Sequence, residues 1–364
     1  MSSKISARQA GLISCLLVMS NKMLLLPSHL YETVKADGIF IMLALFIFDF
    51  ASLFIFIKLK RTYPNQKLLE ILKDKIGTIG AKIIFIIMLV FFFFKIILTF
   101  SIGYLYFQQQ VYQDEFLNIA IVSIFPLACF TVVKGLRPLA RTIEVCYALM
   151  IGGALICISL ALFTPLSLPI FFVSSVKEIS LTAYKNIFAF GDFLFLFLII
   201  DKVDMSKKQE KNLLFHAFLG MFVIIFLYSI FYAKYPVTAF MHNNALSDVV
   251  VFSVEFNAFG RLDVIAMVII CFIAIFQFSL FWYAFCDCLT NIFPKMTNKY
   301  SIVVLTVAFF VMYQFFLGKY EVLVEWANGW QAILGLIITF LLPLIFFILS
   351  FKRRKNEKDI QKSS

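Results

Sequence analysis

The chain has 364 residues, of which 62% are hydrophobic and 15% are charged, and its formal net charge at pH 7 is +11. A mean hydropathy of +0.95 over this length excludes a soluble globular protein. The positive charge does not point to nucleic acid, because it lies in short polar gaps between apolar stretches, where membrane topology explains it. We therefore expect an integral membrane protein that contacts lipid and binds no nucleic acid.

Ten apolar stretches follow one another along the chain, and a helix of about 20 apolar residues spans a bilayer. Backbone groups in lipid must be hydrogen-bonded within the chain, so we expect an all-α protein with ten transmembrane helices. The expected spans are 8–32, 38–58, 80–106, 116–133, 139–163, 182–201, 211–234, 262–288, 299–318 and 330–351. No gap is long enough for a separate globular domain, so residues 1–351 are predicted to form one domain, followed by a basic tail, 352–364.

Lysine and arginine are unevenly divided between the two sides of this topology. One side holds 24 of the 32 basic residues and the other holds six, while Lys22 and Lys95 lie within apolar stretches. The positive-inside rule places the richer side, and with it both termini, in the cytoplasm. Lys4 and Arg8 begin the chain like a signal peptide, but the apolar run that follows is too long and lacks a cleavage site. We expect it to be the first spanning helix.

The first expected span is interrupted near its middle. Met19 is followed by the polar run Ser20-Asn21-Lys22, and Pro27 comes five residues later. A lysine at this depth is costly unless it is paired or hydrated. Lys22 is therefore expected either to form an internal ion pair, to replace a coupling cation, or to contact a ligand carboxylate.

Between the second and third expected spans, residues 63–77 alternate apolar and charged positions with helical spacing. Leu68, Leu69, Leu72 and Ile76 fall on one stripe, and lysines cover the opposite face. This pattern predicts a short amphipathic helix on the cytoplasmic surface, serving as a structural connector.

Two further charges lie within apolar stretches. Asp49 is in the second expected span, and Lys95 follows four consecutive phenylalanines in the third. Each is expensive alone in the membrane, so the sequence favours a structural Asp49–Lys95 ion pair.

The sixth expected span is interrupted by Phe190-Gly191-Asp192. Glycine permits an unwound backbone, and a mid-membrane carboxylate needs a partner. Asp192 is expected either to contact a ligand ammonium, to titrate with a proton, or to pair with Lys22.

The two interruptions lie in the first helix of each five-helix half of the chain. Paired breaks of this kind indicate a transporter-type binding site near the bilayer midplane. The expected ligand-binding residues are Met19, Ser20, Asn21, Lys22, Phe190, Gly191 and Asp192.

Catalytic signatures are not found in the sequence. It contains no Ser/His/Asp, HExxH or phosphate-loop pattern, and the seven cysteines are scattered without metal-binding spacing. We expect no enzyme activity, no catalytic residue, no metal site and no cofactor.

Several different short motifs follow one another in a characteristic order along most of the chain. They are Ile5-Ser-Ala-Arg8-Gln9, Leu24-Leu-Leu26-Pro27, Tyr63-Pro64, Lys134-Gly135-Leu136-Arg137, Arg141-Thr-Ile-Glu144, Phe190-Gly191 and Phe256-Asn-Ala-Phe259-Gly260-Arg261-Leu-Asp263. In this order they resemble the spore germination receptor permease family, the B-type subunits of nutrient germinant receptors. That family belongs to the amino acid–polyamine–organocation transporter superfamily.

The resemblance implies a leucine-transporter-like five-plus-five inverted repeat with broken helices one and six. It implies a small nutrient germinant, such as an amino acid, between the breaks, and work beside A-type and C-type subunits in the inner membrane of the bacterial endospore. Relatives usually have small residues at the first break, whereas this chain has Ser20-Asn21-Lys22. A secondary transporter of amino acids or related organic cations, and a non-binding membrane scaffold, remain as alternatives.

Overall fold

The computed structural model describes residues 4–19, 21–110, 124–207, 209–251, 263–316 and 329–351. These residues are mostly helical, and seven of their helical segments are long and apolar enough to cross a membrane. The seven segments are Leu26–Thr62, Leu68–Tyr106, Leu136–Phe163, Val176–Leu198, Glu210–Lys234, Val264–Ile292 and Trp330–Phe351. Two shorter apolar helices, Ala7–Met19 and Asn298–Val311, accompany them. The chain is therefore an all-α, multi-pass membrane protein.

The helices follow the expected order of apolar stretches. The α-helices are α1 (Ala7–Met19), α2 (Leu26–Val34), α3 (Gly38–Thr62), α4 (Leu68–Gln110), α6 (Ile124–Lys134), α7 (Leu136–Leu160), α8 (Val176–Asn186), α9 (Leu194–Leu198), α10 (Glu210–Lys234), α11 (Ala245–Val251), α12 (Asp263–Ile292), α13 (Asn298–Phe316) and α15 (Trp330–Leu336). Short 3-10 turns are η1 (Asn21–Met23), η2 (Lys35–Asp37), η3 (Ala161–Phe163), η4 (Ile187–Ala189) and η5 (Ala239–Met241), and η7 (Ile337–Leu341) is a π-helical turn. The expected span 116–133 lies partly outside the described residues.

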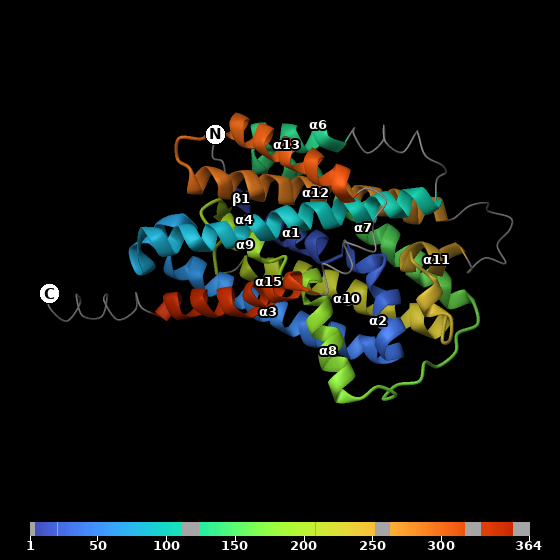
Figure 1. The fold of residues 1–364 in the computed structure, drawn as a ribbon. Helices are drawn as coiled ribbons and strands as arrows, with labels where there is room; N and C mark the ends of the chain where they lie inside the picture. Colours follow the sequence, from blue (N-terminus) through green and yellow to red (C-terminus); the bar gives the residue numbers. More distant parts are fainter. Residues whose placement is uncertain are drawn as a thin grey trace.

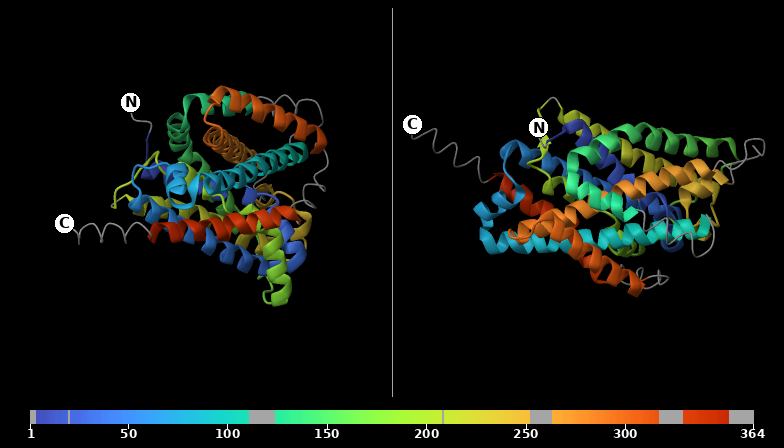
Figure 2. Two further views of the ribbon diagram at one scale, coloured as in Figure 1. Left: turned by 60° about the vertical axis from the view of Figure 1, so that its left-hand side comes forward. Right: turned by 90° about the horizontal axis from the view of Figure 1, so that it is seen from above.

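The long helices form one bundle in which α3, α4 and α12 run along its length, while α8 stands at a steep angle to them (Figures 1 and 2). The bundle packs tightly because glycines allow close backbone approach. A Cβ on Gly220 of α10 would lie 2.9 Å from the carbonyl oxygen of Cys15 in α1. A Cβ on Gly153 of α7 would lie 2.5 Å from Cδ1 of Ile269 in α12. Both glycines thus hold pairs of helices in direct contact.

The expected amphipathic helix is present as the first part of α4. It ends at Gly77, whose φ of 81° departs from the helix. Within the protein, Leu68 and Leu72 of the expected stripe are buried, whereas Ile76 is exposed and Ile71 is buried in its place. The face of this helix that packs against the rest of the protein is therefore rotated from the expected apolar stripe.

One end of the bundle is fastened by the N-terminal segment. Strand β1 (Ile5–Ser6) pairs in parallel with β2 (Val203–Asp204), which follows α9. Lys60, in the last turn of α3, donates hydrogen bonds to the carbonyl oxygens of Ile200 (2.7 Å) and Pro64 (2.5 Å). The hydroxyl of Tyr63 donates to Leu349 in the last helical segment, at 3.4 Å. The first strand and the last helix therefore lie at the same end of the molecule.

Candidate functional site

The break in the first expected span separates α1 from α2. Helix α1 ends at Met19, η1 covers Asn21–Met23, and Pro27 stands in the first turn of α2. Proline suits a helix start, because its missing N–H group would have no intrahelical partner there. Lys22 lies in this non-α-helical connection and is buried.

The break in the sixth expected span separates α8 from α9. Between them come η4 and then Gly191, which has a φ of 81° that L side chains rarely adopt. The Gly191 N–H group, which no helix uses, donates a 3.0 Å hydrogen bond to Oδ1 of Asp49 in α3. Space is also restricted here, since a Cβ on Gly191 would lie 2.8 Å from Cγ2 of Ile338. Glycine thus fixes the position of the following residue, Asp192.

Asp192 joins the two breaks through its carboxylate. Its Oδ2 lies 2.7 Å from Nζ of Lys22, and its Oδ1 lies 2.6 Å from Nζ of Lys95 in α4. The three residues are each 1% exposed, and Asp49 is 2% exposed. Two lysines and two aspartates thus form a buried cluster that is formally neutral. Such balance is required in a low-dielectric interior, where an unpaired charge is very costly.

Aromatic rings surround the two ammonium groups. Nζ of Lys22 is 5.0 Å from the ring centroid of Phe190, and Nζ of Lys95 is 5.3 Å from that of Phe91 and 5.4 Å from that of Phe188. Cation–π attraction at these distances stabilises the lysines without adding negative charge. The rings also exclude water from the ion pairs.

A small apolar cleft lies beside this cluster. Its lining comes from the first break, from α4 and from α12, and it consists of Met23, Leu24, Thr99, Ile102, Gly103, Ile270, Ile273 and Ala274. Thr99 is one helical turn from Lys95 and donates to Oε1 of Gln277 at 3.5 Å. The cleft therefore offers apolar surface close to the buried charges.

A second ion pair fastens the chain beyond α9. Nζ of Lys202 lies 2.6 Å from Oδ1 of Asp287 in α12 and donates to the hydroxyl of Tyr283 at 2.7 Å. Burial alone would lower the pKa of Lys202, but Asp287 and Tyr283 raise it above its ordinary value. Lys202 therefore stays charged, and its ion pair joins the segment after α9 to α12.

The structure brings together most of the expected site residues. Lys22 and Asp192 form the internal ion pair that was one of the expected alternatives. Phe190 and Gly191 lie next to it, whereas the buried Met19 accepts a contact from Sγ of Cys15 at 3.8 Å. Asn21 belongs to η1, and nothing is described of its side chain; Ser20 lies outside the described residues.

The expected Asp49–Lys95 ion pair is wrong. Lys95 pairs with Asp192, and Asp49 accepts instead from the backbone of Gly191. The N–H group of the unwound backbone at Gly191 has no acceptor within a helix, and Asp49 supplies one. Lys95 is thus a residue of the candidate site that the sequence reasoning missed, although a lysine within a phenylalanine-rich span was a signal of it.

Comparison with known proteins gives one family. The family model described as spore germination protein matches residues 4–322, which is most of the chain. No curated protein matches the chain.

Proposed function

Because the chain belongs to the spore germination permease family, we propose that it is the membrane subunit of a nutrient germinant receptor. In this proposal a small nutrient, most simply an amino acid, binds between the two helix breaks. Binding signals to A-type and C-type partner subunits in the inner membrane of the endospore, with both termini cytoplasmic. The chain acts by binding and conformational change rather than by catalysis.

The proposed architecture is one permease-like domain over residues 1–351, with the basic tail 352–364 outside it. Ten spanning helices would form a leucine-transporter-like five-plus-five inverted repeat. The two breaks described above support it, because they fall in the first and sixth expected spans, which occupy equivalent places in the two halves. Half-helix ends at such breaks supply unpaired backbone groups for a ligand.

The observation that carries the proposal is the position of Asp192 between Lys22 and Lys95. An amino acid has one carboxylate and one ammonium group. Its carboxylate can take the place of Asp192 on Lys22, while its ammonium group takes the place of Lys22 on Asp192. The side chains beside the cluster are mostly apolar, like the side chain of an aliphatic amino acid. The expected site residues Met19, Ser20, Asn21, Lys22, Phe190, Gly191 and Asp192 are retained in this proposal, and Lys95 joins them.

Exchange of ion pairs gives the ligand a means of shifting the structure. In the described state Asp192 links the first break to α4, so the half-helices are held in one arrangement. A ligand shifts a conformational equilibrium only through its different affinities for the two states. An amino acid that replaces the Lys22–Asp192 contact would stabilise the arrangement in which this contact is open, and partner subunits would respond to that change.

The test uses spores with the chain, without it, and with the charge-balanced double variant Lys22→Gln/Asp192→Asn. Germination is followed against a panel of amino acids, sugars and nucleosides. We expect deletion to abolish the response to at least one nutrient. The double variant should raise the half-maximal concentration of that nutrient about tenfold or more, because charged hydrogen bonds to the ligand are lost.

The matched control is Arg8→Gln/Glu144→Gln, which removes an ion pair with a 62% exposed arginine side chain and should leave the response unchanged. A deletion strain that responds normally to every nutrient would contradict the receptor assignment. A normal response in the double variant alone would contradict the site. Net uptake of labelled amino acid into sealed vesicles would favour a transporter instead.

A further inference from the structure

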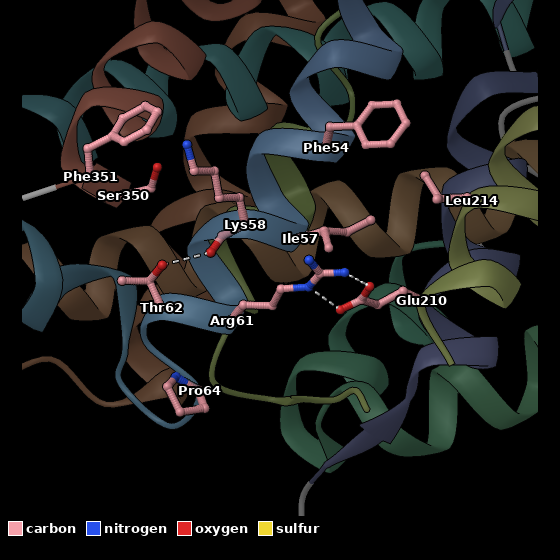
Figure 3. Close-up of a pocket in the computed structure, with 10 residues that line it drawn as sticks. All are labelled: Phe54, Ile57, Lys58, Arg61, Thr62, Pro64, Glu210, Leu214, Ser350 and Phe351. Carbon is pink, nitrogen blue, oxygen red and sulfur yellow. Dashed lines mark hydrogen bonds and ion pairs between the residues drawn. The ribbon is translucent and has the colours of Figure 1, made fainter. Parts of the chain in front are cut away.

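A groove with a volume of about 880 Å³ lies at the end of α3, away from the two helix breaks. Helix α3 runs along it, with α10 on one side and the last helical segment, 342–351, on the other (Figure 3). It is lined by Phe54, Ile57, Lys58, Arg61, Thr62, Pro64, Glu210, Leu214, Ser350 and Phe351. None of the described residues of the candidate nutrient site contributes to it.

The groove lies where three apolar helices reach their ends. Helix α3 ends at Thr62, α10 begins at Glu210, and the described part of the last helix ends at Phe351. At 1.5 Å per residue, the 25 residues of α3 extend about 37 Å, enough to cross the hydrocarbon core of a bilayer. The last turn of α3 therefore reaches the depth of the lipid headgroups.

Cations occupy the end of the groove. Nζ of Lys58 lies 4.2 Å from the ring centroid of Phe347 and 3.1 Å from that of Phe351, which fixes the ammonium group beside the last helix. Across the groove, Arg61 forms a two-point ion pair with Glu210, while its side chain remains 54% exposed (Figure 3). Two cations face one carboxylate, so the groove retains a net positive charge.

The rest of the groove is apolar. Phe54 is 52% exposed, and Ile57 and Leu214 continue the wall from both helices. One turn beyond Leu214, Phe218 is also exposed on α10. Apolar surface thus leads from the outer face of two spanning helices into the groove and ends at the cations. This arrangement matches an amphiphile with an anionic head.

We propose that this groove binds an anionic phospholipid. Its phosphate contacts Lys58 and Arg61, and one acyl chain follows Phe54, Ile57 and Leu214. The chain beyond Phe351 begins Lys352-Arg353-Arg354-Lys355, so its charge has the same sign as that of the groove and does not complement it. The proposal is independent of the nutrient site, because the two share no residue.

The test measures lipid binding to the purified full-length chain in detergent, by native mass spectrometry and by thermal unfolding. The probes are phosphatidylglycerol, phosphatidylcholine with the same acyl chains, and inorganic phosphate. We expect phosphatidylglycerol to bind more tightly than phosphatidylcholine. Lys58→Gln should weaken phosphatidylglycerol binding about fivefold, the effect of one basic residue at a membrane surface.

Matched variants distinguish a loss of lipid binding caused by the missing charge from one caused by misfolding. Lys299→Gln removes an exposed lysine outside the groove and should leave binding unchanged, and Lys58→Arg should restore it. Leu214→Trp fills the apolar half and should weaken both lipids equally. Equal binding of the two lipids, an unchanged affinity in Lys58→Gln, or a thermal shift reproduced by inorganic phosphate would each overturn the proposal.

Discussion

At Asp192 a single carboxylate serves two buried ammonium groups, those of Lys22 and Lys95. Asp192→Asn removes this charge, so that, among the residues the structure describes, Asp49 alone remains to balance two lysines in a low-dielectric interior. We expect a loss of about 3–5 kcal/mol in the free energy of unfolding, the range for breaking a buried ion pair. Thermal unfolding of the purified protein, with lipid and detergent held constant, measures it.

The stability of Asp192→Asn is compared with that of Lys22→Gln/Asp192→Asn, in which the charges of Lys95 and Asp49 balance each other. It should recover part of the stability that the single variant loses, because no excess charge remains buried. A double variant that is less stable than Asp192→Asn would contradict the argument from charge balance. It would indicate that the lysine contributes through packing alone.

The sequence identified the charged residues but not all of their partners. Lys22 and Asp192 could be matched because each interrupts an apolar run, and such interruptions are rare and costly. Opposite charge alone favours a pair of Lys95 with Asp49, but it does not tell which carboxylate a lysine faces. Helix α3 is apolar on nearly all sides, so its rotation, and hence the direction of Asp49, cannot be read from a hydrophobic stripe.

On the scale of elements, Asp37 ties together two halves of the broken helices, α2 and α8. Its carboxylate, at the junction of η2 and α3, accepts hydrogen bonds from the N–H groups of Phe172 (2.6 Å) and Ser174 (2.8 Å). Phe172 has a φ of 61°, an unfavourable conformation for a bulky residue, so the contact must hold it in place. Through this segment, α2 and α8 are coupled.

Asp37→Ala leaves these two N–H groups without their acceptor, and hydrogen bonds to a charged group are worth about 1.5–3 kcal/mol. We expect faster hydrogen exchange at residues 172–176, by roughly tenfold or more, with exchange in α7 unchanged. Glu32→Ala, which removes a nearby exposed carboxylate, is the control. Equal hydrogen exchange in both variants would show that the hydrogen bonds to Asp37 do not hold this segment in place.

The breaks themselves were predictable as elements, but their extent was not. Ser20-Asn21-Lys22 correctly located the end of α1, since α1 stops at Met19. The five-residue length of α9 was not expected, because Leu194 to Ile200 reads as continuous apolar helix. Its end depends on contacts from distant residues, including the hydrogen bond from Lys60 to Ile200.

For the whole molecule, the distribution of lysine and arginine predicts which end faces the cytoplasm. Lys299→Cys should react with a membrane-impermeant maleimide only after the membrane is opened, whereas Lys177→Cys should react from outside. The unchanged chain is the control, because its seven free cysteines are buried or half-buried. Labelling of Lys299→Cys in intact, right-side-out vesicles would contradict the predicted orientation of the chain.

The formal neutrality of the four-residue cluster has an electrical consequence. A charge that crosses the full membrane potential changes in energy by about 2.3 kcal/mol per 100 mV. Under the proposed exchange, Lys22, Lys95, Asp49 and Asp192 receive a zwitterion, so neither the empty nor the filled site carries net charge. Nutrient detection at this site would therefore be insensitive to voltage, and a dormant cell without an energised membrane could still respond.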